Sequence, residues 1–243
     1  MLANNETGAI QPVGEAAEII HQAGGLLHVD AIQAFGKIPF DINSLNADLM
    51  TLSAHKIGGP KGVGTLILAE GVLGLEPALR GGGQELGRRA GTENVAGIAG
   101  FGAAAKAAIA ALEPDAAHIG GLRNRLENGL RQTPGVIVFA DTVERLPNTT
   151  LFTVPGIKAE TAVIGFDLAG IAVSSGSACS SGMVQPSHVL EAMGFSPALA
   201  QGAVRLSLGW STSSDDVDRC IEAWRKLAGI LLKGCDETLL ERF

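Results

Sequence analysis

Short apolar runs that alternate with a helical stretch near the start restrict this chain to a small set of folds. Three runs have the composition of strands, at 26–29, 48–52 and 63–68, and a helical pattern from about Val13 to Ala23 precedes them. Strands that alternate with helices predict an α/β layer on a mostly parallel sheet. We therefore expect residues 1–113 to form part of a large α/β domain.

A second domain is predicted after Glu113. The helical stretch 95–111 is rich in Ala and Gly, and another helical stretch follows at 115–131. Later strand candidates are interleaved with helical segments, at 136–139, 150–154, 171–173 and 204–208. This pattern predicts a smaller α+β domain over 114–243.

The closing helix has one apolar face. Val217, Cys220, Ile221 and Trp224 follow the i, i+3, i+4, i+7 spacing of a buried stripe, and Ser214 is the expected N-cap. We therefore predict that Cys220 is a core residue and not a reactive thiol.

Composition and charge argue against several classes of function. With 46% apolar residues the chain can bury a sizeable core. It carries 18 basic against 25 acidic residues and no basic run, which makes nucleic acid an unexpected partner. No apolar stretch is long enough to span a bilayer, and the first residues do not resemble a signal peptide. We expect a cytosolic protein without a membrane partner.

The three cysteines, Cys179, Cys220 and Cys235, form no CxxC pair and no metal-binding spacing. An odd number of cysteines is typical of a reducing compartment rather than a disulfide framework. A metal hydrolase built from His28, Asp30 and His55 is disfavoured, because no His-x-x-x-His or similar spacing occurs.

Lys56 and Asp30 are the first candidates for chemistry. Lys56 directly follows an apolar strand run and precedes a glycine-rich turn, where a partly desolvated amine could serve as a Schiff-base nucleophile. Asp30 ends a neighbouring run, where its carboxylate could pair with a protonated pyridine nitrogen. A solvated loop lysine and a capping aspartate are the ordinary alternatives. Both residues together, at the carboxyl ends of adjacent strands, lie where α/β sheets bind ligands.

Five motifs follow one another along the chain, at Asn4 to Gly8, His28 to Gln33, Ser53 to Lys56, Gly81 to Asn94, and Ser174 to Gly182. In content and order they resemble the motifs of the cysteine desulfurases, within the class V aminotransferase group. The string Ser-Ser-Gly-Ser-Ala-Cys, which ends at Cys179, is similar to the subgroup that serves nitrogenase and iron–sulfur cluster assembly. The resemblance implies fold type I of the pyridoxal 5'-phosphate (PLP) transferases, with the C-terminal half of the large domain followed by a small α+β domain.

The resemblance also implies roles for individual residues around PLP. Lys56 would carry the cofactor as a Schiff base, and Asp30 would pair with its pyridine nitrogen. The remaining cofactor contacts would come from Asn5, Gln33, Ser53, His55 and Thr92, with Ser53 and His55 at the phosphate. Thr92 would reach the phosphate in the other subunit of a homodimer.

The substrate implied by the resemblance is L-cysteine. Arg205 would bind its carboxylate, a task that suits the bidentate guanidinium fork, and Asn5 would also contact it. Cys179 would take the sulfur as a persulfide and pass it to a scaffold or carrier protein. Taken without the resemblance, Arg205 is an ordinary strand arginine and Cys179 an ordinary loop thiol.

The beginning of the sequence departs from the pattern of the family. The cofactor domain of cysteine desulfurases starts upstream of the first motif here, with a phosphate-binding turn and a histidine that stacks on the ring. We therefore expect Met1 to be an internal residue of a longer protein. The alternatives are another class V enzyme, such as an aminotransferase or a selenocysteine lyase, and a non-catalytic fragment that acts as an assembly partner.

Overall fold

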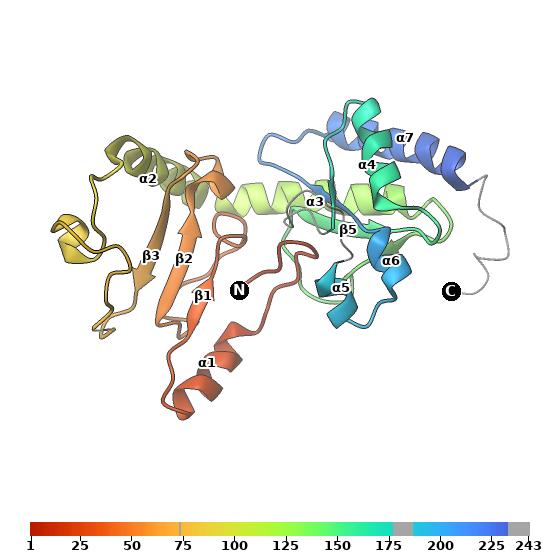
Figure 1. Cartoon of the computed structure of the whole chain (residues 1–243). Coiled ribbons are helices and arrows are strands. Elements are labelled where there is room, and N and C mark those ends of the chain that lie inside the picture. The colour runs from red at the N-terminus through yellow and green to blue at the C-terminus, as the bar shows by residue number, and fades with distance from the viewer. Residues whose placement is uncertain (73, 177–186, 233–243) are drawn as a thin grey trace. The chain divides into compact units, whose positions relative to one another are not determined.

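The computed structural model describes residues 1–72, 74–176 and 187–232, which form two compact units (Figure 1). The first unit comprises Met1–Ala3 and Gln11–Glu113. The second comprises Asn4–Ile10 together with Pro114–Phe243. The loop 4–10 therefore groups with the later part of the chain, although the sequence analysis assigns it to the first domain.

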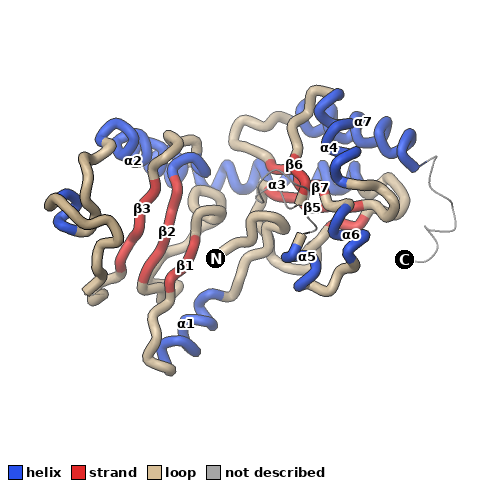
Figure 2. Tube along the Cα trace, viewed as in Figure 1, coloured by secondary structure: helices blue, strands red, loops and turns tan. Residues whose placement is uncertain are grey.

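The first unit is built on a three-stranded sheet with the order β1-β2-β3 (Figure 2). Helix α1 (Val13–Gln22) leads into β1 (His28–Asp30), which pairs in parallel with β2 (Leu49–Ser53). Strand β3 (Gly64–Leu68) pairs with β2 in the antiparallel sense. All three strands lie within one or two residues of the expected runs, and they carry buried apolar side chains at Val29, Met50 and Leu52.

Two helical elements follow the sheet closely. The 3-10 turn η1 (Ala54–Ile57) continues directly from β2, and helix α2 (Val95–Ala110) packs against it. The contact is close because it is made through small residues. A β-carbon at Gly59 would lie 3.0 Å from the Ala54 carbonyl oxygen and 3.2 Å from Ala104 Cβ. A short 3-10 turn, η2 (Gln84–Gly87), lies in the long connection before α2.

The second unit contains a four-stranded antiparallel sheet with the order β4-β5-β7-β6. Its strands are β4 (Ile137–Val138), β5 (Thr149–Thr153), β6 (Ser174–Ser175) and β7 (Val204–Ser207). The strand expected at 171–173 is wrong. The Ile171 amide bonds back to the Phe166 carbonyl and Gly170 adopts φ +75°, so this segment ends the preceding helix and pairing starts only at Ser174.

Helices surround this second sheet. They are α3 (Leu112–Leu130), α4 (Ala159–Leu168), α5 (His188–Ala192), α6 (Pro197–Gln201) and α7 (Ser214–Leu231). Among the described residues no single helix is long and apolar enough to cross a membrane, although α2 and α3, bent by 72° at their junction, pass that test of length and composition as a pair.

Helix α7 presents the predicted apolar stripe to the core. Trp224 is 1% exposed and meets Phe152 edge-on and Phe166 in a stacked arrangement. Cys220 is buried in the same cluster, as predicted. The N-cap is Ser213 rather than the expected Ser214: its hydroxyl accepts from the Asp216 amide, and the Asp216 carboxylate accepts from the Ser213 amide, which forms a capping box.

A buried ion pair connects α3 to the strand region. Arg145 donates to both carboxylate oxygens of Glu127, at 2.9 and 3.1 Å, and the Thr150 hydroxyl donates to the same carboxylate at 2.7 Å. Burial acts to raise the pKa of Glu127, but these hydrogen bonds and the positive charges of Arg145 and Arg123 outweigh burial and lower it. Glu127 is therefore a buried carboxylate held in its charged form.

Candidate functional site

Asp30 and Lys56 lie at the same edge of the first sheet. Asp30 is the last residue of β1 and is in register with Thr51 of the parallel strand β2. Strand β2 ends at Ser53, and Lys56 follows within η1. The two strands are also tied just beyond Asp30, where the Ala31 amide donates to the Thr51 carbonyl at 3.1 Å. A carboxylate and an amine thus stand at the carboxyl ends of two adjacent parallel strands, the position at which such sheets bind ligands.

The side chain of Asp30 also shapes the turn after β1. Its Oδ1 accepts a hydrogen bond from the Ile32 amide at 2.9 Å, which starts the turn that carries Gln33. Asp30 can therefore cap this turn through Oδ1 and still offer its second carboxylate oxygen to a ligand.

Ser53 and His55 contact each other at the end of β2. Ser53 Oγ and His55 Nδ1 are 2.7 Å apart, and His55 is exposed. The turn closes at Gly58, whose φ of +80° is strained for any residue with a side chain. A hydroxyl and an imidazole therefore lie one residue on either side of buried Ala54 and next to Lys56.

Lys37 is a residue of this region that the sequence analysis missed. Its Nζ donates to the Gln33 carbonyl at 2.7 Å. Burial and, to a smaller extent, the charge of Lys56 lower the pKa of Lys37 to about 8. The sequence gives little indication of this contact, because a lysine four residues after Gln33 would ordinarily be solvated.

Thr92 lies apart from this group in the chain. It is exposed in the connection between η2 and α2, two residues before Asn94, whose side chain caps α2 by accepting from the Gly97 amide. Within the described part of the chain no hydrogen bond joins Thr92 to Lys56, Ser53 or His55. Its implied role at the other subunit's cofactor stays a prediction.

In the second unit, the loop 4–10 has a rigid local structure. Asn4 Oδ1 accepts from the amides of Glu6 and Thr7, both at 2.9 Å, and from the Thr7 hydroxyl at 3.2 Å. Gly8 follows with φ +77°, and a β-carbon there would lie 3.2 Å from Thr149 Cβ. The residues Asn4, Thr7 and Gly8 of the first motif thus build the loop that presents Asn5.

Arg205 is held by this loop. It lies on the central strand β7, in register with Leu151 of β5 and Ser174 of β6. Its Nη1 donates to the Asn5 carbonyl at 2.8 Å, whereas its buried Nε has no hydrogen-bond partner in the described residues. A buried guanidinium N–H without an acceptor is unfavourable, and a carboxylate ligand would relieve it.

A second interaction that the sequence analysis missed joins this loop to α5. Glu6 is 5% exposed and Ser187 is fully buried, and the Ser187 hydroxyl donates to Glu6 Oε2 at 2.5 Å. The same hydroxyl accepts from the Leu190 amide and so caps α5. The loop 4–10 therefore contacts both the arginine and the start of α5.

Of the three cysteines, the structure describes only Cys220. Burial raises the pKa of this thiol to about 11, which makes it a poor nucleophile. Cys179 and Cys235 lie outside the described residues, and the role of Cys179 stays a prediction.

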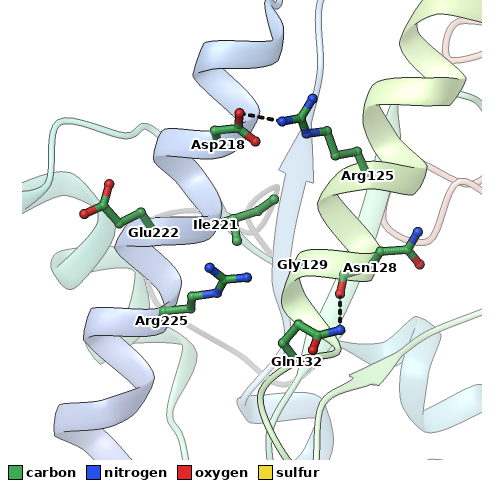
Figure 3. A pocket seen from close by; sticks show the side chains of 8 residues that line it. All are labelled: Arg125, Asn128, Gly129, Gln132, Asp218, Ile221, Glu222 and Arg225. Atoms are coloured by element: carbon green, nitrogen blue, oxygen red, sulfur yellow. Dashed lines mark hydrogen bonds and ion pairs between the residues drawn. The ribbon is translucent and has the colours of Figure 1, made fainter.

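An open groove of about 560 Å³ lies between α3 and α7 in the second unit (Figure 3). Arg125 and Asp218 form an ion pair across it at 2.6 Å, and Ile221 packs onto Gly129, where a β-carbon would lie only 2.5 Å from its Cδ1. The remaining lining residues are Asn128, Gln132, Glu222 and Arg225. Among the residues that the structure describes, none of the predicted site residues lines this groove. No group of three or more His, Cys, Asp or Glu side chains that could hold a metal occurs in the ranges that the structure describes.

Comparison with known proteins identifies the family to which the chain belongs. The sequence model of the family Aminotransferase class-V matches residues 1–220. A cysteine desulfurase of Gluconacetobacter diazotrophicus is 46% identical over 234 residues, which cover 96% of this chain and 58% of that protein. The chain thus spans a little over half the length of the curated relatives it matches.

Solved structures agree in fold. The NifS-like protein of Rickettsia africae has a TM-score of 0.86 and 38% identity, over 94% of this chain and 60% of that one. A structure described as SspA in complex with cysteine has a TM-score of 0.68 and 30% identity, over 85% of this chain and 57% of that one. These similarities confirm the expected fold class, and the match over residues 1–220 shows that the chain belongs to the aminotransferase class-V family.

Proposed function

We propose that this chain is part of a PLP-dependent cysteine desulfurase, which takes sulfur from L-cysteine onto Cys179 and leaves L-alanine. The observation that carries the proposal is the position of Asp30 and Lys56 at the carboxyl ends of two paired parallel strands. The similarity to cysteine desulfurases at 46% identity supports it, as does the related structure described as a complex with cysteine.

The residues present fit the chemical groups of PLP. The Lys56 amine suits the aldehyde, the Asp30 carboxylate suits the pyridine nitrogen, and the Ser53 and His55 pair offers a hydroxyl and an imidazole to the phosphate. Asn5, Gln33 and Thr92 would add the contacts expected from the family. When bound, PLP supplies an electron sink for the carbon next to the substrate nitrogen.

The residues of the chain would then divide the work. Arg205, whose buried Nε has no acceptor in the described residues, would bind the carboxylate of L-cysteine and so orient the substrate. Asp30 would pair with the pyridine nitrogen and favour its protonated form. The Lys56 amine would serve as the base that moves the α-proton of the substrate, which would prepare the bond between Cβ and sulfur for cleavage.

Cys179 completes the proposed reaction. Its thiolate attacks the substrate sulfur, a sulfur–sulfur bond forms as the carbon–sulfur bond breaks, and protonation of the carbon fragment gives L-alanine. The persulfide sulfur then passes to a scaffold or carrier protein for iron–sulfur cluster or thio-cofactor synthesis. A homodimer in the cytoplasm, with Thr92 reaching the partner's cofactor, belongs to the same proposal.

Absorbance spectra of the purified chain with PLP test the first step. We expect a Schiff-base band in the unchanged chain and in Lys61→Ala, an exposed lysine of the following turn, and none in Lys56→Ala. A band that survives Lys56→Ala would overturn the assignment of the cofactor lysine.

A product assay tests the second step. Alanine formed from L-cysteine should require Cys179, so Cys179→Ala should abolish it while keeping the cofactor band. Alanine production that survives Cys179→Ala would instead favour a lyase that releases sulfur or selenium directly.

A further inference from the structure

The turn that follows β1 and carries Gln33, on the way to β2, is packed against the turn of Lys56. A β-carbon at Gly36 would lie 3.0 Å from Ile57 Cγ2 and 3.0 Å from Ala108 Cβ of α2. Ile57 directly follows Lys56 in η1, so the two turns meet at the residue next to Lys56. Backbone hydrogen bonds close the Gln33 turn itself, from Ala34 and Phe35 to the Ala31 carbonyl and from Lys37 and Ile38 to the Ala34 carbonyl.

Lys37 adds a side-chain bond across the same turn. Its Nζ reaches back over four residues and donates to the Gln33 carbonyl at 2.7 Å. Gln33 is thus held both by the backbone hydrogen bonds of its turn and by the side-chain hydrogen bond from Lys37. A hydrogen bond from a charged donor is stronger than a backbone bond between neutral groups.

We propose that Lys37 is a positioning residue of the lysine site, which fixes the turn of Gln33 against the turn of Lys56. The proposal deepens the proposed function and rests on it for the meaning of Gln33, but the geometry at Lys37 can be tested without any cofactor. Lys37 forms no ion pair in the part of the chain that the structure describes.

The charges around Lys37 support this placement. The pKa of Lys37 is lowered to about 8, mainly by burial and to a smaller extent by the charge of Lys56. The other titratable groups on the elements that surround the turn are His28 and Asp30 on β1, His55 on η1 and Lys106 on α2. Lys37 thus donates to the Gln33 carbonyl from a position that disfavours its charged form.

Amide hydrogen exchange of the chain without cofactor decides the structural part. We expect Lys37→Met to speed exchange at Ala34, Phe35 and Ile38 by about tenfold, the effect of losing a hydrogen bond from a charged donor. Lys37→Arg, which keeps a cationic donor, should restore most of the protection, and Lys61→Met should change nothing. Equal exchange in Lys37→Met and the unchanged chain would overturn the proposal.

The pH at which the Lys37 amine loses its proton tests its burial and its proximity to Lys56. Reductive methylation with formaldehyde, read by peptide mass spectrometry, should show a midpoint for Lys37 at a pH of about 8. In Lys56→Met this midpoint should rise, because a neighbouring positive charge is gone. A midpoint of about 10.5 in both proteins would mark Lys37 as an ordinary solvated lysine and overturn the proposal.

PLP binding separates this proposal from the proposed function. If borohydride traps PLP on Lys56 of the unchanged chain, Lys37→Met should weaken PLP binding about tenfold, and unchanged affinity would contradict the positioning role. If no PLP is trapped on any variant, the proposed function fails for this chain. The hydrogen-exchange and methylation results would still decide whether Lys37 fixes the turn of Gln33.

Discussion

Arg205 donates from Nη1 to the backbone carbonyl of Asn5, at 2.8 Å and across 200 positions of sequence. Asn5 belongs to the first of the five motifs, and Arg205 lies on a strand that follows the last of them. Asn5 lies on the loop that Asn4 and Gly8 build, and Arg205 lies on the central strand of the second sheet. The bond therefore fixes the guanidinium in one orientation, with its buried Nε still lacking an acceptor in the described residues.

This arrangement predicts a specific defect in Arg205→Lys. An ammonium keeps the positive charge but cannot hold the Asn5 carbonyl and a carboxylate together in the geometry of a planar fork. We expect KM for L-cysteine to rise by about tenfold or more, with a smaller change in kcat. Steady-state kinetics of the desulfurase reaction would measure the two constants separately.

The matched control is Arg225→Lys, at an arginine of the α3–α7 groove that contacts none of the predicted site residues. Its kinetic constants should equal those of the unchanged protein. If Arg205→Lys behaves in the same way as this control, Arg205 does not bind the substrate.

We expect the unfolding free energy to depend strongly on the Glu127 carboxylate, because it is paired with Arg145 in the protein interior. Glu127→Gln would leave the Arg145 guanidinium, whose side chain is 6% exposed, without its counter-ion. Breaking a buried pair from one side costs about 3–5 kcal/mol of unfolding free energy, whereas replacing both partners by apolar residues costs much less. Chemical denaturation at pH 7 should therefore show a large loss for Glu127→Gln and partial recovery in Glu127→Leu/Arg145→Met.

The same pair should make the folded chain less stable at acid pH. Because the pKa of Glu127 is lowered on folding, its contribution is complete above the unfolded-state pKa of about 4.3 and is lost as the pH falls through the lower folded-state value. Glu127→Gln should lack this acid-dependent component. The exposed pair of Glu222 with Lys226 is the control, and Glu222→Gln should leave the unfolding free energy nearly unchanged, because solvent screens an exposed ion pair.

The sequence predicts the part of the site that depends on strand ends. Asp30 and Lys56 each follow an apolar run, and parallel strands bring their carboxyl ends to one edge, so their shared position follows from pattern alone. The core position of Cys220 follows from helical spacing in the same way. Both are properties of regular elements, whose side chains point in known directions.

The sequence does not predict contacts that depend on irregular backbone. The bond from Lys37 to Gln33 requires a particular series of turns after β1, and a lysine in such a segment is solvated by default. The Glu6–Ser187 bond joins two loops far apart in sequence. The expected strand at 171–173 failed for a related reason: Gly170 can adopt positive φ, which lets the chain close the preceding helix before it enters the sheet.

Cys220 should be inert in the folded chain. It is buried on α7, and its pKa is raised to about 11, so little thiolate forms near neutral pH. We expect iodoacetamide at pH 7.5 to leave Cys220 unmodified until denaturant is added, as read by peptide mass spectrometry. Modification at the same rate with and without denaturant would contradict the burial of this thiol.

Lys37 predicts that raising the pH stabilises the fold of the first unit. Below a pH of about 8 the amine is charged in both the folded and the unfolded chain, and above about 10.5 it is neutral in both. Between these values the unfolded chain holds a proton that the folded chain has released, so unfolding free energy should increase with pH. The gain is at most on the order of 3 kcal/mol, from about 2.5 pKa units at 1.36 kcal/mol each.

The variant Lys37→Met isolates this contribution, because it removes the titrating group and keeps an unbranched apolar side chain of similar length. Denaturation curves recorded from pH 7 to 11 should differ in slope between the unchanged chain and Lys37→Met, with the difference confined to the range between about 8 and 10.5. Lys61→Met, at an exposed lysine of the neighbouring turn, should keep the slope of the unchanged chain. Parallel curves for all three proteins would mean that the pKa of Lys37 is the same in the folded and the unfolded chain, which would contradict the lowered pKa of this half-buried amine.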